Sequence, residues 1–120
     1  MKLNKYFYTE EFDSPDKEGS GKDINYIFIG MLTNARKDYD DVFIITSGVR
    51  TVEHNKKVGG VDSSAHVNGY AADIACNNSR DRYNMAKALI NAGFNRIGIA
   101  KTFIHADCDP EKPEDVIWVY

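Results

Sequence analysis

Residues 63–74 read Ser63-Ser64-Ala65-His66-Val67-Asn68-Gly69-Tyr70-Ala71-Ala72-Asp73-Ile74, and they place a histidine and a carboxylate seven positions apart. A further histidine, His105, stands in a short apolar run late in the sequence. Two histidines and one aspartate suit a catalytic zinc ion, because such sites use three protein ligands and keep one coordination position open for water. The residue types therefore favour a zinc hydrolase of small size.

Length and charge narrow the class of protein. The chain has 120 residues, which is enough for one core and too few for two, so we expect residues 1–120 to form a single domain. It carries 15 basic and 18 acidic residues, for a formal net charge of −3. Proteins that bind nucleic acid by neutralising phosphates normally have a basic excess, so this balance argues against a nucleic-acid partner.

The sequence also bears on location and redox chemistry. No apolar run approaches the roughly 20 residues that span a bilayer, and residues 1–10 are too polar for the apolar part of a signal peptide. We therefore expect no membrane insertion and synthesis in a cytoplasm. Two cysteines, Cys76 and Cys108, cannot make a disulfide framework, and a single bridge between them is left open.

The first third of the chain predicts an extended aromatic segment, a loop and a helix. Tyr6 to Phe12 is the extended segment, and the proline and glycine residues of 13–21 indicate a loop. Apolar residues then recur with helical spacing from Ile24 to Ala35. Asp23 is the expected N-cap of that helix.

The rest of the chain predicts strands with short helices between them. A one- or two-turn helix is expected over Thr51–Val58, and Asn77-Asn78-Ser79 offers N-cap chemistry for a second long helix that ends at Gly93. The strands are expected at 42–46 (buried), 70–75, 96–100 and 103–107 as a hairpin around Lys101-Thr102, and 116–120. The fold class is α+β: a small, mostly antiparallel sheet packed with about two helices.

Strand alternation separates the cysteines from the candidate site. Residues two apart on a strand point to the same face. If Asp73 and His105 face a metal from neighbouring strands, Cys76 and Cys108 lie on the opposite face. We therefore predict that both cysteines are structural and that neither binds zinc.

Each candidate residue also has a plainer explanation. His54, in a polar run, is expected to be an ordinary surface histidine. Asp73 gives the sharpest signal, because a carboxylate within the apolar run 71–75 is costly to bury unless it is paired or bound to metal. Asp107 has three open roles: a general base, a partner that orients a metal ligand, or a surface acid at a strand end. Arg50 is either a substrate clamp or a surface salt-bridge residue.

Residues 64–73 match the motif S-x-H-x-x-G-x-A-x-D position by position, and in this the sequence resembles the zinc D-alanyl-D-alanine carboxypeptidase family. That family includes vancomycin-resistance dipeptidases and phage L-alanyl-D-glutamate endolysins, and it shares a fold with Hedgehog signalling domains. The resemblance covers about residues 42–107 and is closest to the small single-domain branch common in phages and their hosts. Further matches are Ser47-Gly48-Val49-Arg50-Thr51, Glu53-His54-Asn55, Val58-Gly59-Gly60, and Gly98-Ile99 followed by Phe103-Ile104-His105-Ala106-Asp107.

The resemblance implies a role for each matched residue. His66, Asp73 and His105 correspond to the zinc ligands, Arg50 to an arginine that binds substrate or polarises its carbonyl, and Ser64 to a serine near the substrate's terminal carboxylate. Zinc in such a site lowers the pKa of bound water to about 7, and a carboxylate carries the water's proton to the leaving amine. The implied reaction is hydrolysis of a peptide bond in a peptidoglycan stem peptide or cross-link.

Two positions depart from the family pattern. Many members carry an acidic general base three residues before the last histidine ligand, where this chain has Thr102. Asp107 is the nearest replacement, and we assign the base to it. Val49 stands where the family often has tyrosine, a change expected to affect the pocket wall more than the mechanism.

Because Thr102 stands where many family members have an acidic general base, a second class of function remains open. The alternative is a zinc-stabilised, catalytically inactive domain that binds the cell wall or has a structural role in a phage. A weaker option is a non-hydrolytic protein in which the histidines belong to the core. For the peptidase, the absence of a signal peptide implies another route to the wall, either a holin-made lesion or delivery with a phage tail.

Overall fold

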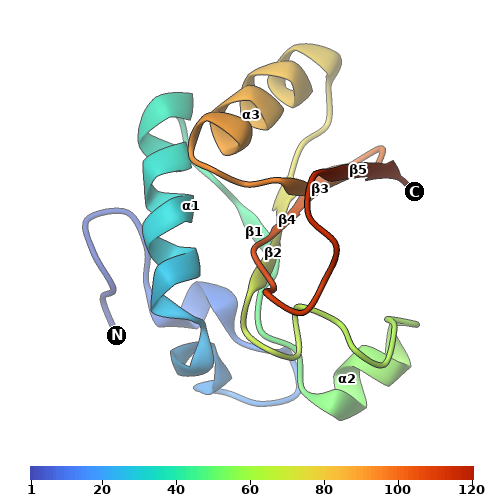
Figure 1. The fold of residues 1–120 in the computed structure, drawn as a ribbon. Coiled ribbons are helices and arrows are strands. Elements are labelled where there is room, and N and C mark those ends of the chain that lie inside the picture. The colour runs from blue at the N-terminus through green and yellow to red at the C-terminus, as the bar shows by residue number, and fades with distance from the viewer.

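The structure is a computed structural model that describes residues 1–120 (Figure 1). Two 3₁₀ turns, Thr9–Phe12 and Ser20–Asp23, precede the regular elements. The helices are α1 (Tyr26–Tyr39), α2 (Val52–Lys57) and α3 (Ser79–Asn91). The strands are β1 (Ile45–Ser47), β2 (Ala71–Ala75), β3 (Arg96–Ile99), β4 (Phe103–Asp107) and β5 (Val116–Val119).

The five strands form one sheet in the order β1-β2-β4-β3-β5. All neighbouring pairs are antiparallel except β3 and β5, which are parallel. This arrangement confirms the predicted α+β class and the mostly antiparallel sheet. The short α2 brings the number of helices to three, of which α1 and α3 are the two long ones.

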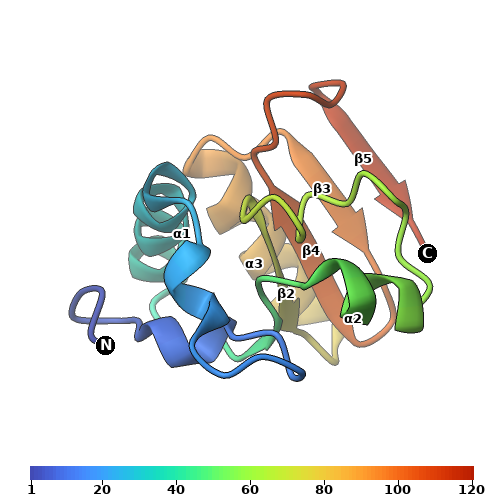
Figure 2. The same ribbon diagram turned by 90° about the horizontal axis from the view of Figure 1, so that it is seen from below.

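One face of the sheet packs against the core and the other carries polar residues. Ile74, Ile97 and Ile104 point to one face and join the buried core with residues of α1 and α3. The alternate residues, among them Asp73 and His105, point to the other face. Figures 1 and 2 show α1 and α3 on one side of the sheet, with α2 and the chain that follows it on the other. The polar face is therefore free to carry a site.

Helix α1 begins two residues later than the sequence predicted. Its N-cap is Asn25, whose side chain accepts hydrogen bonds from the backbone N–H groups of Ile27 and Phe28. Asp23 ends the preceding 3₁₀ turn, so the assignment of Asp23 as N-cap was wrong. The side-chain oxygen of Asn25 satisfies backbone donors that would otherwise lack partners, and this contributes about 1 kcal/mol.

Two further predictions, for residues 6–12 and 42–46, needed correction. The segment 6–12, expected to be extended, contains the turn Thr9–Phe12, because Phe7 and Phe12 both turn inward and stack edge to face. The strand expected over 42–46 is shifted to β1, which covers Ile45–Ser47. Residues 42–44 precede this edge strand, and among them Phe43 is in the core while Val42 and Ile44 are exposed.

The other predicted elements are confirmed. Thr51 and Asn78 cap α2 and α3, and Gly93 follows the end of α3 with a φ of +103°. The hairpin of β3 and β4 and the late strand β5 are present. None of the helices has the length and apolar character that a membrane crossing requires.

The cysteines lie where strand alternation predicted. Cys76 belongs to the buried core, and Cys108 packs against that core. Both are free thiols. Burial and the nearby carboxylates of Asp107 and Asp109 raise the pKa of Cys108 to about 11, so its thiol is protonated at neutral pH and is a poor metal ligand.

Candidate metal centre

His66, Asp73 and His105 converge on the polar face of the sheet. Asp73 in β2 and His105 in β4 are direct partners across the antiparallel pair. His66 comes from the loop before β2, and its Nε2 lies 3.2 Å from Asp73 Oδ1. His105 Nδ1 lies 2.9 Å from the same oxygen. One atom from each side chain falls within 4.8 Å of the others, and all three residues are buried.

The loop that carries His66 is held by a glycine. Gly69 has a φ of +78°, a conformation that residues with a Cβ adopt only under strain. A Cβ there would lie 2.7 Å from the carbonyl oxygen of Asp23. The carbonyl of Gly69 accepts the N–H of Asn25, the residue that caps α1. The glycine thus fixes the loop to the start of α1 and sets the position of His66 beside β2.

The ring of His66 is oriented by the backbone. Its Nδ1 lies 2.8 Å from the carbonyl oxygen of Gly48, which follows β1. A carbonyl can only accept, so Nδ1 carries the proton and Nε2 faces Asp73. A metal-binding histidine commonly donates its other ring N–H to a carbonyl or carboxylate, which fixes its tautomer. His66 meets this condition.

The ring of His105 is oriented by a carboxylate. Its Nε2 lies 2.6 Å from Asp107 Oδ2, so the nitrogen that faces away from Asp73 is bound by an acid. The other oxygen of Asp107 accepts hydrogen bonds from Arg96 Nε, at 2.7 Å, and from the backbone N–H of Asp109. Asp107 is only 1% exposed. These contacts fit the second role considered for Asp107, a partner that orients a metal ligand.

The three donors fit a zinc ion. Two imidazole nitrogens and one carboxylate oxygen are ligands that zinc prefers. In neutral imidazoles, the two nitrogens that face Asp73 carry lone pairs, as the carboxylate oxygen does. Lone pairs repel one another at short distance. The close approach of these three atoms therefore requires protons or a cation between them. Both rings have their second nitrogen bound to an acceptor, as zinc-binding histidines do. The chemistry of the donor set therefore matches the predicted metal.

The charges of the cluster are strongly coupled. Burial alone would raise the pKa of Asp73, but hydrogen bonds with His105 and His66 outweigh it and hold that pKa well below the usual range. Burial also favours neutral His105, yet its hydrogen bonds with Asp107 and Asp73 prevail and raise its pKa. In the metal-free protein, His105 therefore holds its extra proton to a higher pH than a free histidine.

This raised pKa predicts that zinc affinity depends on pH. Zinc must displace the proton of His105, so affinity should rise as the pH passes upward through the raised pKa and level off above it. Below that pKa we expect a change of about tenfold per pH unit for one displaced proton. Calorimetric zinc titrations between about pH 5.5 and 8.5 measure this. A zinc affinity that is constant over this pH range would contradict the raised pKa of His105.

A cavity of about 530 Å³ opens over the metal centre. Its volume lies within the range of about 300–1,000 Å³ that small-molecule sites occupy. Arg50 and Ser64, both predicted site residues, line it beside the three candidate ligands. Five other lining residues were not singled out from the sequence: Val61, Arg96, Lys112, Trp118 and Tyr120.

Arg50 is held at the cavity by polar contacts. Its guanidinium donates to Ser47 Oγ at 3.1 Å and to Asn55 Oδ1 at 3.3 Å, and Nη2 lies 3.4 Å from Asp73 Oδ2. Its backbone N–H binds the carbonyl oxygen of His66. Of the two roles considered for Arg50, this position favours the substrate clamp over the surface salt bridge.

Of the other residues considered from the sequence, one lies at the cavity and two do not. Ser64 is buried at the cavity, where its Oγ accepts the backbone N–H of His66 at 3.2 Å. His54 lies away from the metal centre, in a shallow hollow with Asp16. Thr102 is exposed in the turn between β3 and β4 and is not among the residues that line the cavity.

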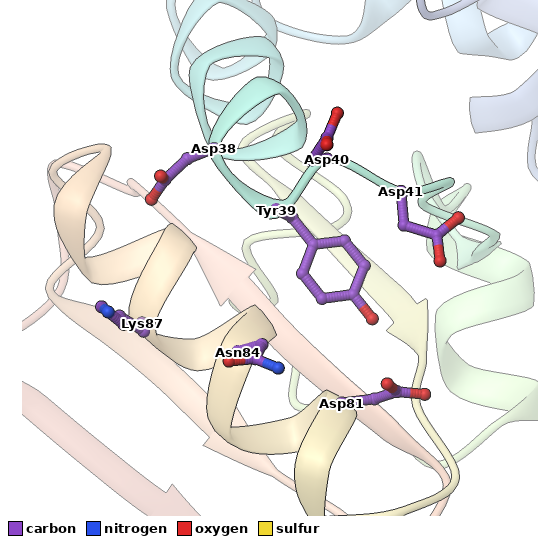
Figure 3. A pocket seen from close by; sticks show the side chains of 7 residues that line it. All are labelled: Asp38, Tyr39, Asp40, Asp41, Asp81, Asn84 and Lys87. Carbon is purple, nitrogen blue, oxygen red and sulfur yellow. The ribbon is translucent and has the colours of Figure 1, made fainter.

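A second hollow, of about 350 Å³, lies between the C-terminal end of α1 and α3 (Figure 3). Seven residues line it: Asp38, Tyr39, Asp40, Asp41, Asp81, Asn84 and Lys87. Four of the seven are aspartates, and none is a histidine or a cysteine. The hollow therefore has no ligand set for zinc comparable to that of the polar face of the sheet.

Comparison with known proteins bears on this site. A family model described as Peptidase M15 matches residues 5–107. The match includes all three candidate ligands and Arg50, and it ends before Lys112 and β5. No curated protein matches the chain.

Proposed function

The chain belongs to the peptidase M15 family, and we propose that it hydrolyses a peptide bond in peptidoglycan stem peptides or cross-links with zinc held by His66, Asp73 and His105. The observation that carries this proposal is the buried His-Asp-His cluster at the base of an open cavity of about 530 Å³. A cluster with a closed surface above it would serve folding alone. The open cavity above this cluster supports access of a peptide to it.

In the proposed hydrolysis, the metal and the side chains of the protein would have different roles. When bound, zinc supplies a Lewis acid that polarises a carbonyl and makes water a nucleophile at neutral pH. Asp73, His66 through Nε2 and His105 through Nδ1 would hold the ion. Gly48 and Asp107 keep both rings in the required tautomer.

Arg50 is the proposed electrophilic partner. Its guanidinium lies at the cavity next to Asp73, where a cation can stabilise negative charge that develops on a carbonyl oxygen. Ser64 lines the same cavity and can hydrogen-bond a substrate carboxylate. The two residues would thus fix the substrate from the side opposite to β4 and β5.

Replacing Arg50 by alanine should lower kcat by about 10²–10³-fold, the usual cost of one oxyanion-stabilising donor. Arg50 also contacts the candidate ligand Asp73, so zinc affinity is measured separately and kcat is compared only at saturating zinc. Arg50→Lys is the matched variant: it keeps the charge but loses the planar fork, and should fall between wild type and alanine. Steady-state hydrolysis at saturating zinc measures this. An Arg50→Ala enzyme with wild-type kcat would remove Arg50 from the mechanism.

The general base is the residue that would take the proton of the attacking water. Sequence reasoning assigned it to Asp107, and that assignment stays a prediction. Asp107 does line the cavity, but both of its oxygens are already engaged, by His105 on one side and by Arg96 and the Asp109 N–H on the other. We therefore favour the role in which Asp107 positions His105.

The engaged carboxylates also favour the second candidate, a zinc-stabilised domain that binds the wall or serves in a phage particle without turnover. Neither Asp73 nor Asp107 is free to take a proton from water without losing a present contact. In either case the place of action would be the cell wall, reached through a phage-made lesion or with a virion.

Release of new amino groups from purified peptidoglycan tests the proposal. Zinc-loaded wild type should release them, and Asp73→Asn, prepared in the same way, should not. Sedimentation with the same peptidoglycan supplies the second readout. Wild type that sediments with the wall but releases no amino groups would favour the binding domain over the peptidase.

A further inference from the structure

Strand β5 lies outside the segment matched by the family model, yet it reaches the metal centre. In the sheet register, Gly98 of β3 stands between His105 of β4 and Trp118 of β5. The three residues share the polar face. The centroids of the Trp118 and His105 rings are 5.3 Å apart, with an interplanar angle of 50°. An aromatic ring two strands away therefore contacts a candidate zinc ligand.

This contact depends on the bare backbone of Gly98. A Cβ at that position would lie 2.6 Å from Trp118 Nε1 and 2.7 Å from Trp118 Cε2, closer than real Cβ atoms approach such atoms. The indole therefore lies across β3 in the space that a side chain would fill. Without the glycine, Trp118 could not keep this position beside His105.

The same indole supports the acid that orients His105. The guanidinium carbon of Arg96 lies 5.1 Å from the Trp118 ring centroid, a cation–π contact. Arg96 Nε donates to Asp107 Oδ1, and Asp107 Oδ2 binds His105 Nε2. Trp118, Arg96, Asp107 and His105 thus form a closed ring of contacts over three strands.

We propose that Trp118 is a positioning residue for the metal centre: it holds the His105 ring with Nδ1 directed at the metal, both by direct contact and through Arg96 and Asp107. The inference rests on the proposed function in so far as His105 binds the metal. His66 closes the opposite side, with its ring centroid 5.0 Å from that of His105. The imidazole thus has an aromatic neighbour on either side and a carboxylate on Nε2, so turning about its Cβ–Cγ bond breaks several contacts at once.

Tyr120, two residues after Trp118, lies next to Trp118 at the cavity. Its ring lies 5.1 Å from that of Phe103, and its Cε2 would be 2.9 Å from a Cβ on Gly98. Trp118 and Tyr120 both line the cavity. Trp118 of β5 and the adjoining Tyr120 therefore form part of the cavity lining next to His105.

The test uses the fact that Trp118 is the chain's single tryptophan. Zinc titration of the metal-free protein should change the tryptophan emission with the same midpoint as calorimetric binding, because the metal changes the charge and orientation of the neighbouring imidazole. His105→Ala should abolish that emission change. The emission shows whether Trp118 senses the metal centre, and the zinc affinities of the variants show whether it positions His105.

Four variants complete the experiment. Trp118→Leu should weaken zinc binding by about tenfold, the lower end of what loss of a supporting contact costs, and Trp118→Phe should restore most of it. Gly98→Ala should weaken zinc binding to a similar extent while keeping the indole, because it displaces Trp118 without removing it. Ile117→Ala, an exposed change on the opposite face of β5, should bind zinc as wild type does.

The outcomes separate this inference from the proposed function. If Trp118→Leu and Gly98→Ala bind zinc as tightly as wild type, the positioning role is overturned and the zinc site stands, whatever the emission shows. If wild type binds no zinc, both fail. Should Trp118→Leu not fold, Gly98→Ala still decides the question.

Discussion

Asp73→Asn is expected to weaken zinc binding by more than 100-fold and to abolish peptide hydrolysis. Loss of a contact that only supports a ligand already costs about 10–100-fold in metal affinity, and loss of the ligand itself should cost more. Asp73 supplies the cluster's one carboxylate, and it lies between both imidazoles and Arg50. An amide oxygen in its place has no charge to offset the cation. Calorimetry and amino-group release measure the two effects.

The matched control is Asp62→Asn, the same chemical change at an exposed residue near the cavity that does not line it. It should leave zinc affinity and hydrolysis unchanged. Thermal unfolding of both metal-free variants shows whether the fold survives. A folded Asp73→Asn protein that binds zinc as tightly as wild type would remove Asp73 from the ligand set.

Asp107→Asn should separate the two roles of Asp107. If Asp107 positions His105, the variant should bind zinc about 10–100-fold more weakly, but zinc at saturating concentration should restore kcat to within about tenfold of wild type. If Asp107 is the general base, kcat should stay about 10²–10⁴-fold low however much zinc is added. The contacts with His105 and Arg96 lead us to expect the first result.

Asp109→Asn is the control for this change. Asp109 is also buried and follows β4, but its carboxylate accepts the Glu111 N–H and a long contact from Asn68, with no contact to His105. It should affect folding stability without a specific loss of zinc affinity. Equal losses of zinc affinity in both variants would mean that general packing, and not orientation of the ring, explains the effect of Asp107.

The sequence was sufficient for the part of the fold that depends on local pattern. Alternation in 70–75 and 103–107 gave two strands with Asp73 and His105 on one face, and these strands are direct partners in the sheet. Capping residues and glycines located α2 and the ends of α3. The start of α1 was misplaced because Asp23 and Asn25 both have side chains suited to an N-cap. Only the turn that ends at Asp23 decides between them.

The sequence was insufficient for contacts that depend on pairing between distant strands. Nothing local in 116–120 shows that β5 runs parallel to β3, or that Trp118 stands level with Gly98. Arg96 was missed for the same reason, since its partner Asp107 is identified only once the hairpin register is known. A glycine in a predicted strand was the available signal, because such a residue often marks a close approach by another group.

The zinc content of the purified, metal-replete protein, after dialysis against metal-free buffer, tests the metal centre most directly. A three-residue site of the catalytic type predicts about one zinc ion per wild-type chain and almost none in Asp73→Asn. Elemental analysis of both proteins gives these values. Wild-type protein that is folded but retains no more zinc than the variant would contradict the account.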